Sequence, residues 1–394
     1  MSSIAIARLG WSDLIEPVPQ PIAGIEPLTG TLAAVVARIE EMIGRHGDSQ
    51  ARRVPSAGAT YPYEILLTAA DSGPLALVDL SRRQVVVRVH DRFPVDAARY
   101  RCLLVGRPWL SMRKYGPRGY LYHLLDCGHA AFNLALLSAN TTGAQSFTEQ
   151  FDPTPLRENV IGDILAAGSV NPPTAPGPTA GWRMVRAGDT RLQAGRTAFE
   201  KWASRISPPG LEHPIAFDSV RQLPGELFDA VPERRSAAAL RSGVDPGTLD
   251  AVVADAVHAA NSALAQLNLP WPGIAVLGSA GLGTPLLDGD LLTGLSGQEQ
   301  LVDADAFIVL SAPRGADENI DEQRQTLLFA AGVVGQTIYL TATRHRVAVT
   351  GIGGIEPEFW NRALPPGHQA VYLLGLGHPA AGAKRDALYP GAHG

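Results

Sequence analysis

Residues 113–129 read RKYGPRGYLYHLLDCGH and join a polar stretch to the start of an apolar helix. Thirty of the thirty-three cationic side chains in the chain are arginine, so Lys114 is an exception in the densest polar segment. Lysine, unlike arginine, can lose its proton when it is buried. A turn at Gly116-Pro117 would let the ammonium of Lys114 and the phenol of Tyr115 face one substrate. We therefore expect these two residues to take part in proton chemistry, with a surface loop of no function as the alternative.

Length and composition describe a globular protein of two domains. The 394 residues exceed one typical core, and 45% hydrophobic against 18% charged residues excludes a disordered chain. A net charge of -5 gives no reason to bind nucleic acid or an anionic membrane. Cys102 and Cys127 lie in apolar company and are interpreted as buried thiols in a reducing compartment. The N-terminus does not resemble a signal peptide, and the longest apolar stretch, 327–340, is interrupted by Gln336, so we expect a cytoplasmic protein.

Proline-rich segments at residues 168–181 and 207–214 separate two sets of predicted elements. The domain boundary is therefore expected between about 168 and 225. For the first half, the patterns predict a helix over 31–45, strands over 63–68, 75–79 and 84–89, and a helix over 124–140. For the second half, they predict a helix from about 232, a helix over 249–264, a strand over 306–311, a helix over 322–342 and a strand over 370–374.

The two longest apolar helices align with each other at an offset of about 204 positions. This offset places Gly128 on Gly332, and each glycine opens an alanine-rich helix that can pack closely. Asp126 of the first helix becomes Ala330 in the second, so the two copies are not expected to carry equal chemistry. The pattern indicates a divergent internal duplication.

The segment 55–62, PSAGATYP, lies between the first predicted helix and a strand. It combines a hydroxyl with a residue that has no Cβ, so its backbone N–H groups can approach a planar or anionic ligand. A cofactor could rest on its first residues, Pro55, Ser56, Ala57 and Gly58. A plain turn between helix and strand is the alternative.

Arg234, Arg235 and Ser236 lie where the first helix of the second half is expected to begin. Helix N-termini and guanidinium groups both favour phosphate, so this triplet is a candidate phosphate site, with a solvated basic turn as the alternative. Lys384 and Arg385 could add charge to the same site.

Two other patterns are not expected to be functional. His123 and His129 suggest a metal, but no second cluster of histidine, cysteine or carboxylate residues lies at ligand spacing. The glycine-rich residues 278–284 lack the strand, helix and downstream acid of a dinucleotide-binding loop.

Taken together, residues 55–62, 114–120 and 125–129, with Asn133 on the following helix, resemble the flavin-dependent nitroreductase superfamily. Within it they resemble the branch of SagB-type dehydrogenases, the azoline oxidases of ribosomal peptide biosynthesis. Residues 234–236 resemble the start of the phosphate-binding element of the superfamily.

This resemblance covers most of residues 50–385 and implies an α+β fold of two tandem nitroreductase-like domains. Each domain would be a mainly antiparallel sheet flanked by helices, over residues 1–200 with the Lys-Tyr loop and 201–394 with the phosphate-binding arginines. Members of the superfamily normally form dimers with FMN in the subunit interface. The chain would fuse that dimer into an intramolecular pseudo-dimer with one FMN, leaving the other pseudo-site empty. Ala238 stands where the family has a further arginine, so phosphate binding would either be weaker or be assisted by Arg241, Lys384 and Arg385.

The function that the resemblance implies is FMN-dependent oxidation of thiazoline or oxazoline rings in a ribosomally made peptide. Tyr115 or Lys114 would remove the ring proton while hydride passes to the flavin. Arg118 and Tyr120 would shape the substrate pocket, and Asp126 and Asn133 would orient the flavin or brace the helix. The expected partners are the modified peptide and a cyclodehydratase complex, and further association of the chain stays open.

Two other functions also stay open at this point. One is an NAD(P)H-dependent nitro or quinone reductase, and the other is a flavin-free scaffold that binds a peptide or a modifying enzyme. Neither a metal nor a nucleic acid nor a membrane is expected as a partner.

Overall fold

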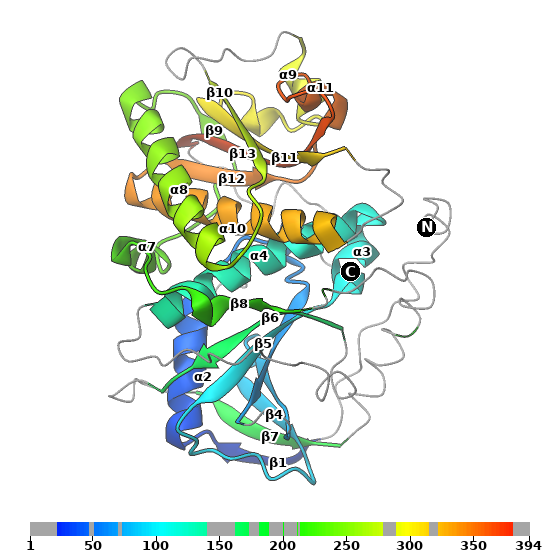
Figure 1. Ribbon diagram of the computed structural model, residues 1–394, viewed down its shortest axis with the longest axis vertical. Coiled ribbons are helices and arrows are strands. Elements are labelled where there is room, and N and C mark those ends of the chain that lie inside the picture. The colour runs from blue at the N-terminus through cyan, green and yellow to red at the C-terminus, as the bar shows by residue number, and fades with distance from the viewer. Residues whose placement is uncertain are drawn as a thin grey trace.

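The structure is a computed structural model, and it describes residues 22–46, 51–69, 73–139, 162–172, 181–188, 200, 211, 213–278, 289–314 and 322–380. Two β-sheets lie at opposite ends of the molecule, with long helices between them (Figure 1). The α+β fold predicted from the sequence is confirmed.

The first sheet has eight strands in the order β1-β7-β4-β3-β2-β5-β6-β8. Most of its pairs are antiparallel, and β4–β7 and β6–β8 are parallel. Central strand β5 is buried along its whole length, as its apolar run requires, whereas β4 alternates between buried and half-buried residues. Its strands are β1 (Ile22–Pro27), β2 (Tyr63–Thr68), β3 (Ala76–Asp79), β4 (Gln84–Arg88), β5 (Tyr100–Gly106), β6 (Asp163–Val170), β7 (Arg183–Ala187) and β8 (Ile215–Ala216).

The second sheet is antiparallel, with the order β10-β11-β13-β12 and a short strand β9 paired to β13. Its strands are β9 (Leu240–Arg241), β10 (Gly273–Gly278), β11 (Ala306–Pro313), β12 (Ala348–Ile352) and β13 (His368–Pro379). We call the first sheet with its helices the first lobe, and the second sheet with its helices the second lobe. Since β8 still belongs to the first sheet, the chain passes to the second lobe between residues 216 and 240.

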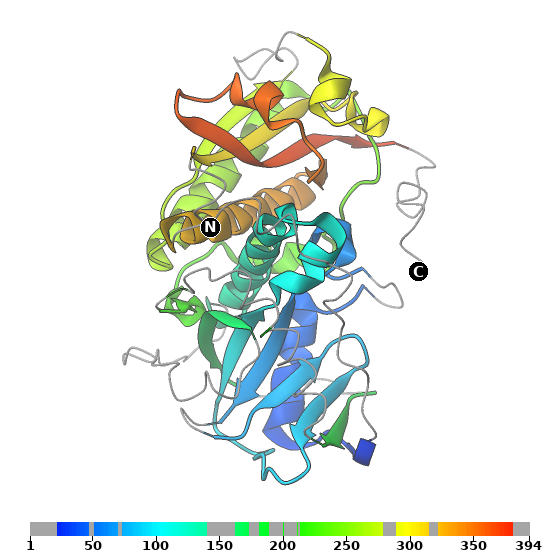
Figure 2. The ribbon, with the colours of Figure 1, turned by 90° about the vertical axis from the view of Figure 1, so that its right-hand side faces the viewer.

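Two long helices, α4 (Arg118–Ala139) and α10 (Glu322–Arg344), pack against each other between the sheets (Figures 1 and 2). They cross at the two glycines that the sequence offset aligned. A Cβ on Gly128 would lie 2.1 Å from the carbonyl oxygen of Phe329, and one on Gly332 would lie 2.2 Å from that of Leu125. No side chain fits at either position, so the backbones meet directly and bring the lobes together.

The remaining helices surround this pair. They are α2 (Gly30–Ile43), α3 (Pro108–Tyr115), α7 (Gly225–Ala230), α8 (Pro246–Gln266), α9 (Leu291–Gly294) and α11 (Pro357–Asn361), with 3₁₀ turns η2 (Ala57–Ala59), η3 (Phe217–Ser219) and η4 (Glu299–Leu301). One large hydrophobic cluster contains buried residues of both lobes, and a smaller one lies within the second lobe. Among the described helices, α10 alone has the length and apolar composition to cross a membrane, and here it is a mostly buried core helix.

Two predicted boundaries around the Lys-Tyr segment were wrong. Lys114 and Tyr115 form the last turn of α3 instead of a loop, because Pro108 occupies the first turn of a helix that Gly116 ends with a φ of 59°. The next helix, α4, begins at Arg118 and not near residue 124. The polar start of α4 hid this helical turn, since its apolar pattern begins later.

The helix predicted from about residue 232 was also wrong. Helix α7 ends at Ala230, and a turn follows that contains Pro232. Proline lacks an N–H group and cannot continue a helix, so here it follows a helix end instead of opening a helix. Residues 234–237 are consequently irregular, and the N–H groups of a helix do not surround the arginines.

Candidate functional site

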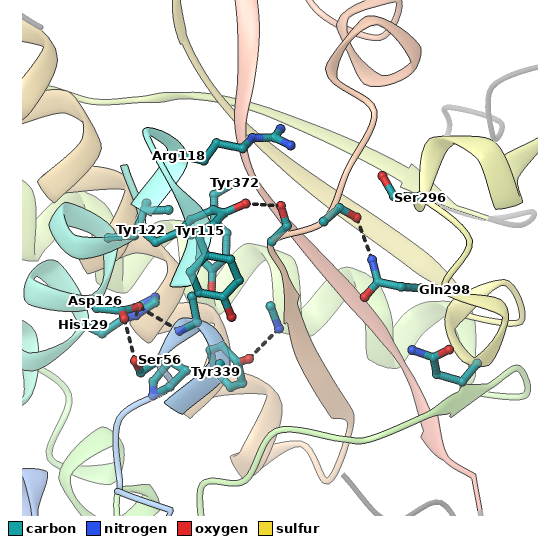
Figure 3. Close-up of a pocket in the computed structure, with 18 residues that line it drawn as sticks. Ser56, Tyr115, Arg118, Tyr122, Asp126, His129, Ser296, Gln298, Tyr339 and Tyr372 are labelled. Atoms are coloured by element: carbon teal, nitrogen blue, oxygen red, sulfur yellow. Dashed lines mark hydrogen bonds and ion pairs between the residues drawn. The ribbon is translucent and has the colours of Figure 1, made fainter. Parts of the chain in front are cut away.

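A cavity of about 390 Å³ lies where the two lobes meet, and we call it the interlobe cavity. Side chains of the first lobe, Tyr115 and Tyr122 among them, line one side, and Ser296 and Gln298 of the second lobe line the other (Figure 3). The lining residues are Pro55, Ser56, Ala57, Gly58, Tyr115, Arg118, Tyr122, Leu125, Asp126, His129, Ser296, Gln298, Gln300, Tyr339, Gly351, Gly353, Gly354 and Tyr372.

The predicted cofactor loop forms part of this cavity and is fixed to helix α4. The hydroxyl of Ser56 donates to the buried carboxylate of Asp126 at 2.6 Å, and the N–H of Ala57 donates to the same carboxylate at 3.3 Å. The Ser56 oxygen also accepts from the N–H of Tyr61 at 2.8 Å. Asp126 is thus used to hold the loop, and the loop conformation is set before any ligand arrives.

Gly58 brings the two predicted motifs into contact. Its φ of 54° favours glycine, and a Cβ at this position would lie 2.0 Å from the hydroxyl of Tyr115 and 2.5 Å from the Nζ of Lys114. The Nζ of Lys114 donates to the carbonyl of Gly58 at 3.1 Å. The structure therefore places a phenol, an ammonium and the cofactor loop within one small volume.

The two members of the Lys-Tyr pair have different surroundings. Tyr115 is half-buried and lines the cavity, and its ring packs edge-on against that of Tyr122 with centroids 5.0 Å apart. Lys114 lies behind the Gly58 carbonyl, with its Nζ 5.6 Å from the centroid of the Tyr115 ring. Partial desolvation lowers the pKa of Lys114 below its ordinary value. Tyr115 is thus the member of the pair that faces the cavity.

Polar contacts across the cavity hold its second-lobe wall, residues 351–355. Tyr122 donates its hydroxyl hydrogen to the carbonyl of Gly353 at 2.5 Å, and Arg118 donates to the carbonyl of Ile355 at 3.3 Å. From the second lobe, Gln298 donates to the carbonyl of Gly354 at 2.6 Å. Arg118, predicted as a pocket residue, does line the cavity, where it is exposed.

His129 lies at the inner end of the cavity and is 1% exposed. Within the described part of the chain, neither of its ring nitrogens forms a well-aligned hydrogen bond, and its nearest carboxylate oxygen, on Asp126, is 4.0 Å away. Burial and the nearby charge of Arg234 lower the pKa of His129 to about 3, against a small opposing effect of the Pro55 carbonyl. The imidazole is therefore neutral at ordinary pH.

Arg234 lies next to the cavity, against the lining residue Tyr339, but is not itself a lining residue. It is 2% exposed, and it donates to the backbone carbonyls of Arg53 at 2.7 Å and of Arg52 at 2.9 Å, just before the cofactor loop. Its guanidinium carbon lies 5.3 Å from the centroid of the Tyr339 ring, and the hydroxyl of Ser236 lies 3.1 Å from that of Tyr339. Tyr339 lines the cavity, whereas Arg234 and Ser236 contact Tyr339 and are not among the lining residues.

Arg235 is exposed and lies outside the cavity lining. It donates to the carbonyl of Pro232 at 2.8 Å and lies 3.2 Å from the ring of His46. Burial and the neighbouring guanidinium groups, that of Arg235 first, lower the pKa of His46 to about 3, so this ring adds no charge. The role of the arginines as a phosphate site stays a prediction, and Lys384 and Arg385 lie outside the described residues.

Tyr120 and Asn133, the other two predicted pocket residues, are buried and do not line the cavity. Asn133 donates to the carbonyl of Met42 at 2.7 Å and accepts from Gln336 of α10 at 2.8 Å. Of the two roles expected for Asn133, bracing the helix is the one that these contacts support.

Several lining residues were not anticipated from the sequence. They include Tyr122, Tyr339, Tyr372, Ser296, Gln298, Gln300 and the glycines of residues 351–354. The Gly-Ile-Gly-Gly run at residues 351–354, which begins in the last two residues of strand β12, is the one signal that could have pointed to this wall, since such a run lets a ligand approach the backbone. Over the residues that the structure describes, no group of three potential metal ligands gathers.

No protein-family model matches the chain, and no curated protein does either. Among solved structures, a candidate nitroreductase from Anabaena variabilis matches with a TM-score of 0.62 at 20% sequence identity, over 96% of each chain. A nitroreductase family protein from Clostridium novyi NT covers 40% of this chain and 88% of its own, with a TM-score of 0.29 and 17% identity. A nitroreductase-like family protein from Bacillus cereus covers 39% and 86%, with a TM-score of 0.29 and 17% identity. The first match shows that the chain has a nitroreductase-like fold along nearly its whole length.

Proposed function

We propose that the chain is an FMN-dependent dehydrogenase that oxidises thiazoline or oxazoline rings of a ribosomally made peptide to azoles. The observation that carries this proposal is the contact of Lys114 and Tyr115 with Gly58 at the wall of the interlobe cavity. The sequence motifs that resemble azoline oxidases thus meet in space, within a nitroreductase-like fold. A modified peptide is the proposed substrate, and a cyclodehydratase complex that makes the ring is a proposed partner.

The lining residues fit the ring system of a flavin. Such a ring is planar and largely apolar with a polar edge, and cofactor sites combine aromatic walls with a few placed polar groups. The cavity offers tyrosines 115, 122, 339 and 372, glycine-lined walls at Gly58 and residues 351–354, and the unpartnered imidazole of His129. Arg118 is the cation among the described lining residues, and Arg234 adds positive charge from behind Tyr339.

The residues of the chain would divide the work of dehydrogenation as follows. FMN, when bound, would supply the hydride acceptor, with oxygen as the final oxidant. The Tyr115 oxygen faces the cavity and would take the acidic proton of the azoline ring as general base. An ammonium beside a phenol favours the phenolate, and the Lys114 Nζ is held there by its bond to the Gly58 carbonyl. Loss of one proton and one hydride converts the azoline ring to the azole.

The two lobes would be the halves of a fused pseudo-dimer with one FMN between them, and the chain passes from one half to the other between residues 216 and 240. The meeting of Gly128 and Gly332 at the helix crossing supports this proposal, because the sequence offset had aligned these two positions. Polar residues line the cavity from α4, whereas α10 contributes Tyr339. A single functional site per chain agrees with this asymmetry.

An absorbance spectrum of the purified protein with a count of flavin per chain tests the proposal. We expect a yellow protein with about one FMN per chain, which oxidises an azoline peptide in air. A colourless protein that FMN cannot reconstitute would contradict it and support a peptide-binding scaffold. Rapid bleaching of bound flavin by NADPH, with no turnover of azoline peptides, would instead show a nitro or quinone reductase.

A further inference from the structure

His129 is a buried polar side chain, and among the described residues neither of its ring nitrogens has a hydrogen-bond partner of good geometry, although the backbone of Pro55 is close enough to act on its pKa. Burying a polar group without a hydrogen bond costs about 1–3 kcal/mol, so such groups in folded proteins usually meet a ligand or water. His129 lines the interlobe cavity, where a ligand can reach it. The glycine at position 335 leaves room for the ring, because a Cβ there would lie 2.9 Å from its Nε2.

The surroundings of His129 are aromatic, with one cation, Arg234, acting on the ring and one carboxylate, Asp126, 4.0 Å from it. The rings of Tyr372 and Tyr339 lie 5.5 Å and 6.3 Å from it, and the charge of Arg234 acts on it from the connecting segment. The nearest acid, Asp126, is occupied by Ser56 and the N–H of Ala57. The neutral imidazole can thus both donate and accept a hydrogen bond. The charge of Arg234 acts on it, and the carboxylate of Asp126 is hydrogen-bonded to Ser56 and Ala57 instead.

We propose that His129 hydrogen-bonds a polar atom of the cofactor in the interlobe cavity and, with Arg234 behind it, favours the reduced, anionic form of that cofactor. This inference rests on the proposed flavin-dependent function. Hydrogen bonds to a charged acceptor are roughly twice as strong as those to a neutral one. A donor at this position should therefore stabilise the anionic reduced flavin more than the neutral oxidised flavin, which raises the reduction potential.

Helix α4 supplies a matched control in His123. It is also fully buried, burial also lowers its pKa to about 3, and its Nε2 likewise has no partner among the described residues. Its Nδ1 lies 3.3 Å from the carbonyl of Tyr120, and the ring lies outside the cavity lining. The two histidines therefore share burial and helix, and differ in access to the cavity.

The experiment compares His129→Phe, His123→Phe and the wild-type protein after removal and titration of FMN. Flavin fluorescence quenching gives the Kd, and a spectroelectrochemical titration gives the two-electron potential. We expect His129→Phe to weaken binding of oxidised FMN about tenfold, the loss of one hydrogen bond of about 1.4 kcal/mol. A further tenfold loss for the reduced form would lower the potential by about 30 mV. His129→Gln, whose amide can form a hydrogen bond in place of the imidazole, should recover part of the lost FMN affinity and part of the lost potential.

The apo-protein gives a readout that a purely structural role would not share. Removing an unpartnered imidazole should leave the free energy of unfolding of apo His129→Phe unchanged or higher, while the affinity for FMN falls. His123→Phe should bind FMN within about twofold of wild type, because it acts at a distance from the cavity. His129→Leu replaces His129→Phe in these measurements if the larger ring prevents folding.

The outcomes distinguish the inference about His129 from the proposed flavin-dependent function. Unchanged affinity and potential in the His129 variants, with normal binding by wild type, would overturn the inference and leave the flavin-dependent function standing. Equal losses in the His123 and His129 variants would also overturn it, since the effect would then come from the helix. A wild-type protein that binds no FMN would refute the proposed function itself.

Discussion

Helices α4 and α10 both lie between the two sheets and cross at a pair of aligned glycines, Gly128 and Gly332. They nevertheless present different surfaces to the cavity. Helix α4 contributes Arg118, Tyr122, Leu125, Asp126 and His129 to the lining, whereas α10 contributes Tyr339. At the positions that the offset aligns with Asp126 and His129, α10 carries Ala330 and Val333, and both are fully buried in the core.

The difference shows how two equivalent helices can keep the same packing while only one of them, α4, carries polar groups for a site. Both helices keep the small residue that their close crossing requires, because the backbone contact leaves no alternative. Polar groups have a cost in a core and persist where a site uses them. In α4 the carboxylate of Asp126 holds the cofactor loop, whereas the aligned residue in α10, Ala330, has no side-chain group that can form a hydrogen bond. Catalysis is therefore expected to depend on residues around α4, while stability depends on both helices.

The largest expected effect concerns turnover at the α4 side. Tyr115→Phe removes the proposed base and should lower kcat for azoline oxidation by about 10²- to 10⁴-fold, the usual contribution of general base catalysis. Lys114→Met should lower kcat less, because it removes a neighbouring charge and not the cavity-facing base. Both proteins should keep the flavin spectrum. Arg113→Met, an exposed cation on the same helix turn, serves as the control for loss of charge. Wild-type turnover in Tyr115→Phe would remove this residue from the mechanism.

The second effect is a pH dependence of stability to which α4 contributes two buried histidines and α10 contributes none within its bounds. His46, whose pKa is also lowered to about 3, adds to it from outside both helices. The pKa values of His123 and His129 are about 3 in the folded protein, below the ordinary value of 6.5, so the unfolded chain binds their protons first on acidification. Their stabilising effect is complete above pH 6.5 and is lost as the pH falls toward 3, by up to about 1.4 kcal/mol per pH unit for each histidine. Urea unfolding between pH 7 and pH 4 measures this slope. His123→Phe should make the slope shallower, and an unchanged slope would contradict the assignment.

The fold could be predicted to the extent that its segments carry strong local patterns. Strand β2 and helices α2, α8 and α10 were expected close to their observed bounds, because their apolar periodicity is regular. The two-residue strands β8 and β9 are too short for any pattern, and their pairing is set by tertiary contacts. Strand β5 was missed although all of its residues are buried, because a continuous apolar run does not alternate.

The candidate site could be predicted only on the side where its residues are close in sequence. Residues 55–58 and 114–115 carry recognisable chemistry, and the structure brings them together at Gly58. Tyr339 and Tyr372 are apolar-looking members of a core helix and strand, and they reach the cavity only through the helix crossing. The bonds of Arg234 to two backbone carbonyls likewise depend on tertiary structure and leave no trace in the sequence.

The third effect concerns the crossing that both helices share. Gly128→Ala places a Cβ 2.1 Å from a backbone oxygen of α10, so the helices must separate, and we expect the free energy of unfolding to fall by about 1–3 kcal/mol. Gly247→Ala in α8 is the control, because that position is exposed and its nearest neighbour is a side-chain oxygen at 3.2 Å. Urea unfolding should show no loss for the control, given the helix propensity of alanine. If both variants were equally stable, the close crossing would be in doubt.

The smallest effect tests whether the contacts across the cavity join the lobes. Tyr122→Phe removes a hydroxyl that donates to Gly353 of the second lobe, and Tyr100→Phe removes one that donates to Pro94 and accepts from the N–H of Ala97 within the first lobe. Tyr122→Phe should cost about 1 kcal/mol of folding free energy, the net value of one hydrogen bond, and Tyr100→Phe at least as much. Only Tyr122→Phe should also weaken FMN binding, because residues 353–355 form the cavity wall that its hydroxyl holds. Equal FMN affinity in the two variants would mean that the wall keeps its place through Arg118 and Gln298 alone, and the two lobes would then be joined at the cavity more loosely than at the glycine crossing.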